Sequence, residues 1–133
     1  MRLEPIGAIS QLNAKKPLSS FFLYNLLIYE DGLLFIQQNT GSTAQGILGA
    51  AFGVGVKAGQ YPDRESMISD SKNHWYVKDQ VSSINIKKGW FVDKINIKLK
   101  DGNNIKCGSK KGYKQRDNII RFFPSFFSQT LIS

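Results

Sequence analysis

The residues of this chain best suited to chemistry are the lysines of its second half, and they favour anion binding. The stretch 87–116 contains ten Lys or Arg residues and only two acidic ones, so its net charge equals the net charge of the whole chain, +8. Such a surface attracts lipid membranes, nucleic acids or acidic proteins, although basic surfaces also serve solubility alone. The candidate anion- or lipid-binding residues are Lys87, Lys88, Lys94, Lys98, Lys100, Lys106, Lys110, Lys111 and Lys114.

Catalytic and metal-binding chemistry has little support in the sequence. The chain has one histidine, His74, and one cysteine, Cys107, and neither has the partners that a nucleophilic or metal site needs. Asp63, Glu65 and Asp70 lie close in sequence, but their spacing matches no calcium loop. We therefore expect no enzyme activity, no metal and no cofactor. His74 is expected at a strand edge, and Cys107 is expected to point inward as a small apolar residue.

A segment rich in glycine and alanine, residues 41–59, interrupts the pattern of the chain. It contains six of the twelve glycines, and its small residues recur four apart, a spacing that lets backbones approach closely. Two interpretations stay open: a flexible loop inserted between strands, or a short element that dips into a membrane or packs on a second copy. The second is suggested by five apolar residues that a solvated loop should not contain. These candidate membrane or self-contact residues are Ile47, Leu48, Phe52, Val54 and Val56.

Alternating hydrophobicity predicts a chain made mainly of strands. Two apolar runs, residues 21–29 and 33–38, flank an Asp-Gly pair, which is a strong hairpin signal. Residues 61–73 are predicted to form a polar loop. In the strand predicted at 90–100, isoleucines alternate with lysines, so the lysines should share one outer face. The remaining strands are predicted at 3–12, 74–78, 81–87 and after the turn at 101–103.

The C-terminal part of the chain changes to a helical period. Ser109 is a candidate N-cap, and an apolar stripe predicts a basic amphipathic helix over residues 109–123. Pro124 is expected to end this helix. The apolar tail at 124–133 contains two further phenylalanines, and this much aromatic surface must be covered by the domain's own core or by a partner.

The order of these elements resembles that of bacterial PH-like and GRAM-like domains over about residues 20–123, the Gly/Ala segment excepted. The resemblance implies a mainly β fold with one C-terminal α-helix, a PH-like strongly bent antiparallel barrel capped by that helix, in one domain over 1–133. This family mostly binds lipid head groups, peptides or copies of itself and is rarely catalytic. The first hairpin is acidic at Glu30-Asp31-Gly32, where the family's inositide motif is basic, so the resemblance does not predict specific inositide binding. The matching segments are Leu23–Ile36, Val81-Ser82-Ser83-Ile84, Asp101-Gly102 and Arg116–Phe123.

These observations predict a non-catalytic binding module, with three hypotheses about its partner. The first is peripheral association with an anionic lipid surface through the lysines, by a cytoplasmic protein at the inner face of a membrane. The alternative is a protein-interaction or self-assembly module, a homo-oligomer included, that uses the Gly/Ala segment and the Phe-rich tail. The third is nucleic-acid binding, which is less favoured because aromatic residues interleave poorly with the lysines. No apolar stretch is long enough to cross a membrane, and no small-molecule substrate is evident.

Overall fold

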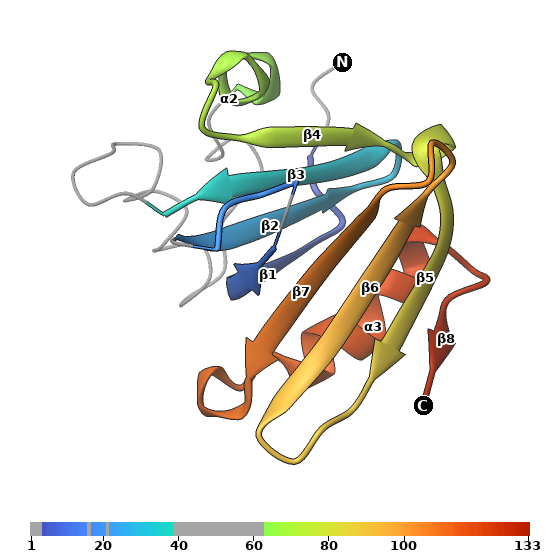
Figure 1. Cartoon of the computed structure of the whole chain (residues 1–133). Coiled ribbons are helices and arrows are strands. Elements are labelled where there is room, and N and C mark those ends of the chain that lie inside the picture. The colour runs from blue at the N-terminus through green and yellow to red at the C-terminus, as the bar shows by residue number, and fades with distance from the viewer. Residues whose placement is uncertain (1–3, 16, 21, 39–62) are drawn as a thin grey trace.

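The computed structural model describes residues 4–15, 17–20, 22–38 and 63–133 (Figure 1). Within them, eight strands form one sheet in the order β4-β3-β2-β1-β7-β6-β5-β8. Neighbouring strands are antiparallel except β5 and β8, which are parallel. The strands are β1 (Gly7–Ala14), β2 (Leu23–Tyr29), β3 (Gly32–Gln37), β4 (His74–Val77), β5 (Val81–Lys87), β6 (Val92–Leu99), β7 (Asn104–Lys110) and β8 (Leu131–Ile132). The helices are α2 (Arg64–Ser69) and α3 (Arg116–Phe126), with 3-10 turns η1 (Lys78–Gln80) and η2 (Lys111–Tyr113).

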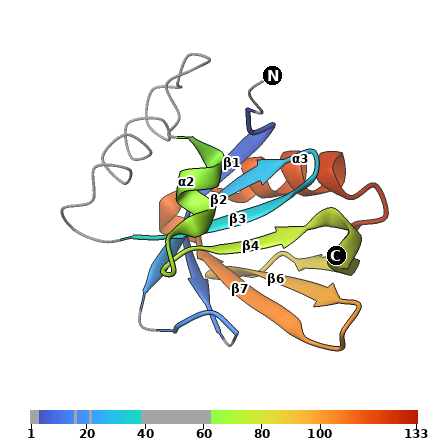
Figure 2. The same cartoon turned by 90° about the horizontal axis from the view of Figure 1, so that it is seen from above.

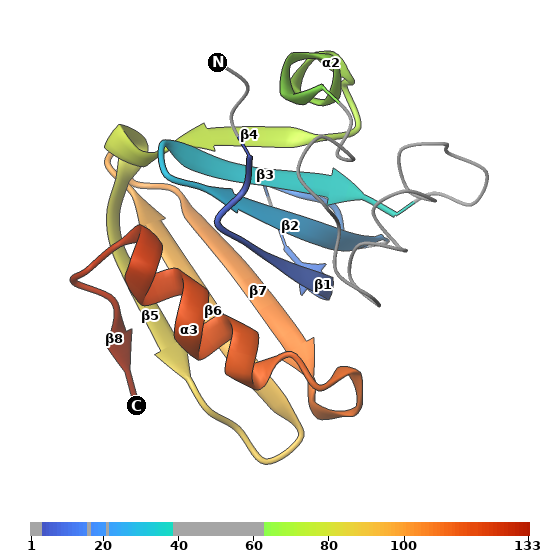
Figure 3. The ribbon, with the colours of Figure 1, turned by 180° about the vertical axis from the view of Figure 1, so that it is seen from behind.

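The sheet bends into two arms, β1–β4 and β5–β7, and α3 lies across the inside of the bend (Figures 1 and 3). The arms meet where the last two residues of β1 pair with β7, Asn13 with Gly108 and Ala14 with Cys107. A register shift between Ile9 and Leu12 precedes this joint, and Gln11 there has a left-handed φ of 59°. Such a bulge bends a strand, which explains how β1 can serve both arms. The mainly β fold with a C-terminal helix is confirmed, as a bent sheet whose end strands are β4 and β8.

The inner core joins the two arms to α3. Fully buried side chains from β2 and β3, such as Leu26 and Phe35, form one cluster with Ile97 of β6 and with Ile119 and Phe123 of α3. Burying an aliphatic or aromatic side chain of this size contributes about 1.5–3 kcal/mol, so this cluster is the main source of stability. It fixes α3 on the inner face and leaves the opposite face of β5–β7 free of any described helix.

The helix α3 differs at both ends from the helix predicted at 109–123. Ser109 is not its cap, because β7 continues to Lys110 and buries Ser109 opposite Asp93 of β6. The helix begins only at Arg116. At the other end, α3 continues past Pro124 to Phe126, which is 1% exposed, so the packing of this ring offsets the hydrogen bond that a proline cannot donate.

A second apolar cluster covers the outer face of the first arm, where α2 replaces part of the loop predicted at 61–73. Met67 of α2 is 3% exposed and packs against Leu27, Leu34 and neighbouring side chains of β2 and β3. The Asp63 carboxylate caps the helix by accepting a hydrogen bond from the Ser66 backbone N–H at 3.2 Å. Figure 2 shows α2 leading into β4.

The Gly/Ala segment lies outside the described residues, and so do its candidate contact residues Ile47, Leu48, Phe52, Val54 and Val56. In the part of the chain that the structure describes, no helix is long and apolar enough to cross a membrane.

Candidate anion-binding surface

Five strand lysines lie on the outer face of β5, β6 and β7. The helix α3 covers the other face of these strands (Figure 1). The strand alternation that buries the isoleucines of β6 on the inner face directs these lysines outward. Lys87 of β5 pairs directly with Lys94 of β6, while Lys106 of β7 pairs with Asn96. We call this surface the lysine face, and its members are Lys87, Lys94, Lys98, Lys106 and Lys110.

The lysine face is electrostatically unbalanced. Among the described residues, no carboxylate lies within ion-pair distance of its ammonium groups; the ion pairs present involve Arg64 and Arg116. Like charges directly opposite on a sheet, as in the Lys87–Lys94 pair, are destabilising. An anion placed against this face would relieve that repulsion.

The other predicted lysines are also exposed but lie in loops at two ends of the arm. Lys100 lies in the β6–β7 turn. Lys88, Lys111 and Lys114 lie at the opposite end, where the β5–β6 loop meets the chain that follows β7. Two of the predicted neighbours on the helix, Lys110 and Lys111, are therefore on β7 and η2 instead. Lys114, also expected on the helix, precedes it with a left-handed φ of 56°.

The β5–β6 loop also exposes two aromatic side chains, which the sequence had placed at the start of a strand. The strand begins at Val92, and Trp90 and Phe91 precede it with exposed fractions of 79% and 75%. Their rings make an edge contact with centroids 6.4 Å apart. The Lys111 ammonium lies 5.8 Å from the centre of the Trp90 ring. We call Trp90 and Phe91 the aromatic tip. Two adjacent large aromatics after Gly89 could have signalled it, since neighbouring strand residues cannot both face inward.

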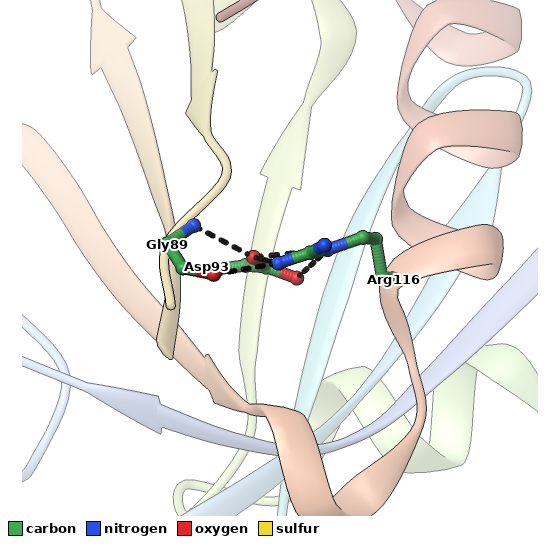
Figure 4. Close-up of polar contacts among 3 residues, drawn as sticks. All are labelled: Gly89, Asp93 and Arg116. Atoms are coloured by element: carbon green, nitrogen blue, oxygen red, sulfur yellow. Dashed lines mark hydrogen bonds and ion pairs between the residues drawn. The ribbon is translucent and has the colours of Figure 1, made fainter. Parts of the chain in front are cut away.

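A partly buried ion pair fixes the base of this loop (Figure 4). The Asp93 side chain, 5% exposed, accepts hydrogen bonds from Arg116 Nη2 at 2.7 Å and Nε at 3.0 Å, and from the Gly89 backbone N–H at 3.0 Å. Arg116 Nη2 also donates to the Gly89 carbonyl at 2.7 Å. The hydrogen bond from Arg116 lowers the pKa of Asp93 and raises that of Arg116. Arg116 belongs to the basic stretch 87–116 and to the helix predicted at 109–123, but its charge is compensated by Asp93 on the inner face.

A cleft of about 650 Å³ opens beside this ion pair, between the end of β7 and the start of α3. Its lining contains four basic and two acidic residues, namely Lys110, Lys111, Lys114 and Arg116 with Asp93 and Asp117. Because Arg116 is paired with Asp93, the three lysines outweigh the remaining Asp117, so the cleft is net positive and adjoins the lysine face at Lys110.

The two candidate chemical residues lie where the sequence predicted, away from this surface. His74 is in β4, at one end of the sheet, with its ring 5.9 Å from that of Tyr24, and burial lowers its pKa. Cys107 is buried on the inner face of β7, and burial raises its pKa to about 12, which keeps the thiol protonated and unreactive. Within the described ranges, no group of three or more His, Cys, Asp or Glu residues could bind a metal ion.

The Phe-rich tail is mostly used within the domain. Phe126 is buried in the inner core, and Phe122 and Phe127 pack against that core. Two apolar side chains of β8 stay exposed beside β5, Leu131 at 66% and Ile132 at 38%.

Comparison with known proteins places the fold but no family. No protein-family model matches the sequence. No curated protein matches it either. Among solved structures, the chain is similar to one in the structure of the Spt16D Pob3N heterodimer, with a TM-score of 0.53 and 9% identity. The match covers 99% of this chain and 55% of that chain, so this chain spans about half the length of its structural neighbour. At this identity the similarity concerns the fold, and it is consistent with a PH-like bent sheet closed by a helix.

Proposed function

We propose that this chain is a non-catalytic binding module that associates peripherally with anionic lipid surfaces, at the inner face of a membrane. One observation carries the proposal. Nine exposed lysines gather on β5–β7 and the loops at their ends, and no described carboxylate pairs with them. Such an arrangement gains free energy when it meets a surface of negative charge.

The strength of this attraction can be bounded. Each lysine near an anionic bilayer contributes about 1 kcal/mol. If the five lysines of one face act together, the sum is about 5 kcal/mol, less than the roughly 8 kcal/mol of micromolar binding. Binding through charge alone is therefore expected to be weak, reversible and sensitive to salt.

The test is sedimentation with vesicles of phosphatidylserine and phosphatidylcholine. Substituting Lys94, Lys98, Lys100 and Lys106 by Glu removes two charge units at each position and brings the net charge of the chain from +8 to zero. It should therefore abolish binding while the circular dichroism spectrum stays unchanged. A single Lys94→Glu variant can be compared with Lys72→Glu, because Lys72 is exposed in the turn between α2 and β4, on the other arm. Equal binding by the wild-type chain and the fourfold variant would refute the proposal, and tight retention of an oligonucleotide instead would favour a nucleic-acid partner.

A second candidate function, a protein-interaction module, is supported by a different observation. The structural neighbour belongs to a heterodimer, and nearly the whole of this chain aligns with it. Light scattering of the intact chain, beside a variant that lacks residues 44–58, tests self-assembly. An oligomer that dissociates on this deletion and does not bind vesicles would support this candidate over the lipid surface.

A further inference from the structure

The aromatic tip is the most exposed pair of large apolar side chains in the described part of the chain. Trp90 is 79% exposed and Phe91 is 75% exposed, whereas most other large apolar residues are buried. Two aromatic rings held side by side in water are unfavourable unless they meet a partner. Trp in particular is enriched at the boundary between lipid head groups and acyl chains.

The loop that displays these rings is held in shape from inside the protein. The Asp93–Arg116 pair binds both the N–H and the carbonyl of Gly89, just before the tip (Figure 4). The Phe91 carbonyl, on the other side, accepts a hydrogen bond from the Lys111 N–H at 2.9 Å. The rings are therefore presented by a fixed loop, so their ordering adds little cost when they bind.

These same hydrogen bonds lower the free-energy cost of moving the β5–β6 loop from water to an apolar environment. A backbone N–H or carbonyl that enters an apolar environment without a partner is costly. At Gly89 and Phe91 the groups named above already have partners within the protein. The loop can thus approach an apolar boundary without exposing them.

The charges around the tip complement an anionic bilayer. Lys87 and Lys88 precede the tip along the chain, and Lys110 and Lys111 lie beside it across the β6–β7 pairing. Each of these four is exposed. Aromatic rings at the front with ammonium groups just behind them match the order of layers in a bilayer, where the phosphates lie outside the acyl chains.

We propose that the module docks with this end first, with Trp90 and Phe91 inserted at the head-group boundary of an anionic bilayer. The inference rests on the proposed lipid association and adds its orientation and its anchoring residues. Lysines near the tip then contact phosphates. Lys98 lies six residues beyond Val92 on β6, which is about 20 Å at the rise of a strand. This exceeds the Debye length of about 8 Å at physiological salt, so its contribution is small.

Quenching of tryptophan fluorescence by vesicles with brominated acyl chains tests the insertion. The chain contains two tryptophans, and Trp75 packs against Tyr29 and Arg64 on the first arm. Trp90→Phe serves as the control, since a side chain this exposed tolerates substitution. Brominated lipid should quench the wild-type emission and leave that of Trp90→Phe unchanged. Trp90→Ala should weaken vesicle binding about tenfold.

A charge-matched pair of variants tests the orientation. Substituting Lys87 and Lys88 by Gln should weaken vesicle binding more than substituting Lys98 and Lys100 by Gln. Equal losses, or a wild-type chain that sediments with vesicles while its Trp90 is not quenched, would overturn this inference and leave the proposed function standing. A wild-type chain that does not bind vesicles would overturn both this inference and the proposed function. A Trp90 emission that responds to soluble polyglutamate, and not to vesicles, would assign the tip to an acidic protein instead.

Discussion

Replacing Asp93 by Asn removes the negative charge from the partly buried Asp93–Arg116 ion pair while keeping the shape of the side chain. The Asn carboxamide oxygen can still accept from the Gly89 N–H and from Arg116 Nη2, as Asp93 Oδ1 does, but the carboxamide NH2 group cannot accept from Arg116 Nε, and the negative charge opposite Arg116 is lost. Hydrogen bonds to charged groups contribute about 1.5–3 kcal/mol. Breaking a fully buried pair costs about 3–5 kcal/mol, but the Arg116 side chain is 39% exposed and stays hydrated. We therefore expect the free energy of unfolding to fall by about 2 kcal/mol, near the lower end of the range for hydrogen bonds to charged groups.

Urea denaturation at neutral pH measures this loss, and thermal denaturation should show a Tm lower by about 8 °C for a chain of this size. The difference between the two proteins must also depend on pH. Because the pKa of Asp93 is lowered on folding, its carboxylate stabilises the fold above its unfolded pKa, about 3.9. This contribution is lost as the pH falls through the folded pKa. The wild-type advantage should thus be complete near pH 7 and shrink below about pH 4. An advantage under 0.5 kcal/mol at pH 7, or one that grows in acid, would refute the role given to this pair.

Three further predictions concern the core, the thiol and the tip. Phe123→Ala should lower the free energy of unfolding by about 4 kcal/mol, because Phe123 is fully buried between α3 and the sheet; a loss below 1 kcal/mol in urea would contradict this packing. Cys107 should not react with a thiol reagent until the chain unfolds, since its pKa is raised to about 12 by burial; rapid labelling of the native protein would show the thiol to be accessible. Trp90→Ala should change stability by less than about 0.5 kcal/mol, as expected for an exposed side chain, so a large drop in Tm would mean that the tip is structural.

Much of the fold is predictable from local patterns in the sequence. The Asp31-Gly32 pair predicts the first hairpin, which forms with Tyr29 opposite Gly32. The alternation along β6 predicts which residues face inward, and it correctly directs the lysines of β5–β7 outward. A period of two is a strong signal because one slip would expose the whole core face.

The errors arise where distant contacts decide the structure. Ser109 looks like a helix cap by composition, but its pairing with Asp93 of β6 keeps it in strand β7. The helix α3 continues beyond Pro124 to Phe126 because the Phe126 ring is buried among core residues that are distant in sequence. Residues 64–69 look like a polar loop, yet Met67 and Ile68 pack against an apolar outer face formed by β2 and β3. None of these contacts can be read from a local window of sequence.

The aromatic tip was missed for a related reason. Trp90 and Phe91 have strong strand propensity and precede an alternating run, so a pattern-based boundary includes them. The structure ends the pairing at Val92 because the Asp93–Arg116 pair turns the chain at Gly89. Arg116 lies 23 positions from Asp93, and a local pattern gives no sign of that partner.

The central claim, attraction of the lysines to an anionic lipid surface, is tested most directly by vesicle sedimentation of the wild-type chain over a series of phosphatidylserine contents and salt concentrations. The account predicts binding that rises with the anionic lipid and weakens strongly from about 0.1 M to about 1 M salt, as the Debye length falls from about 10 Å to about 3 Å. Equal binding to neutral and anionic vesicles, or no binding to either, would contradict it.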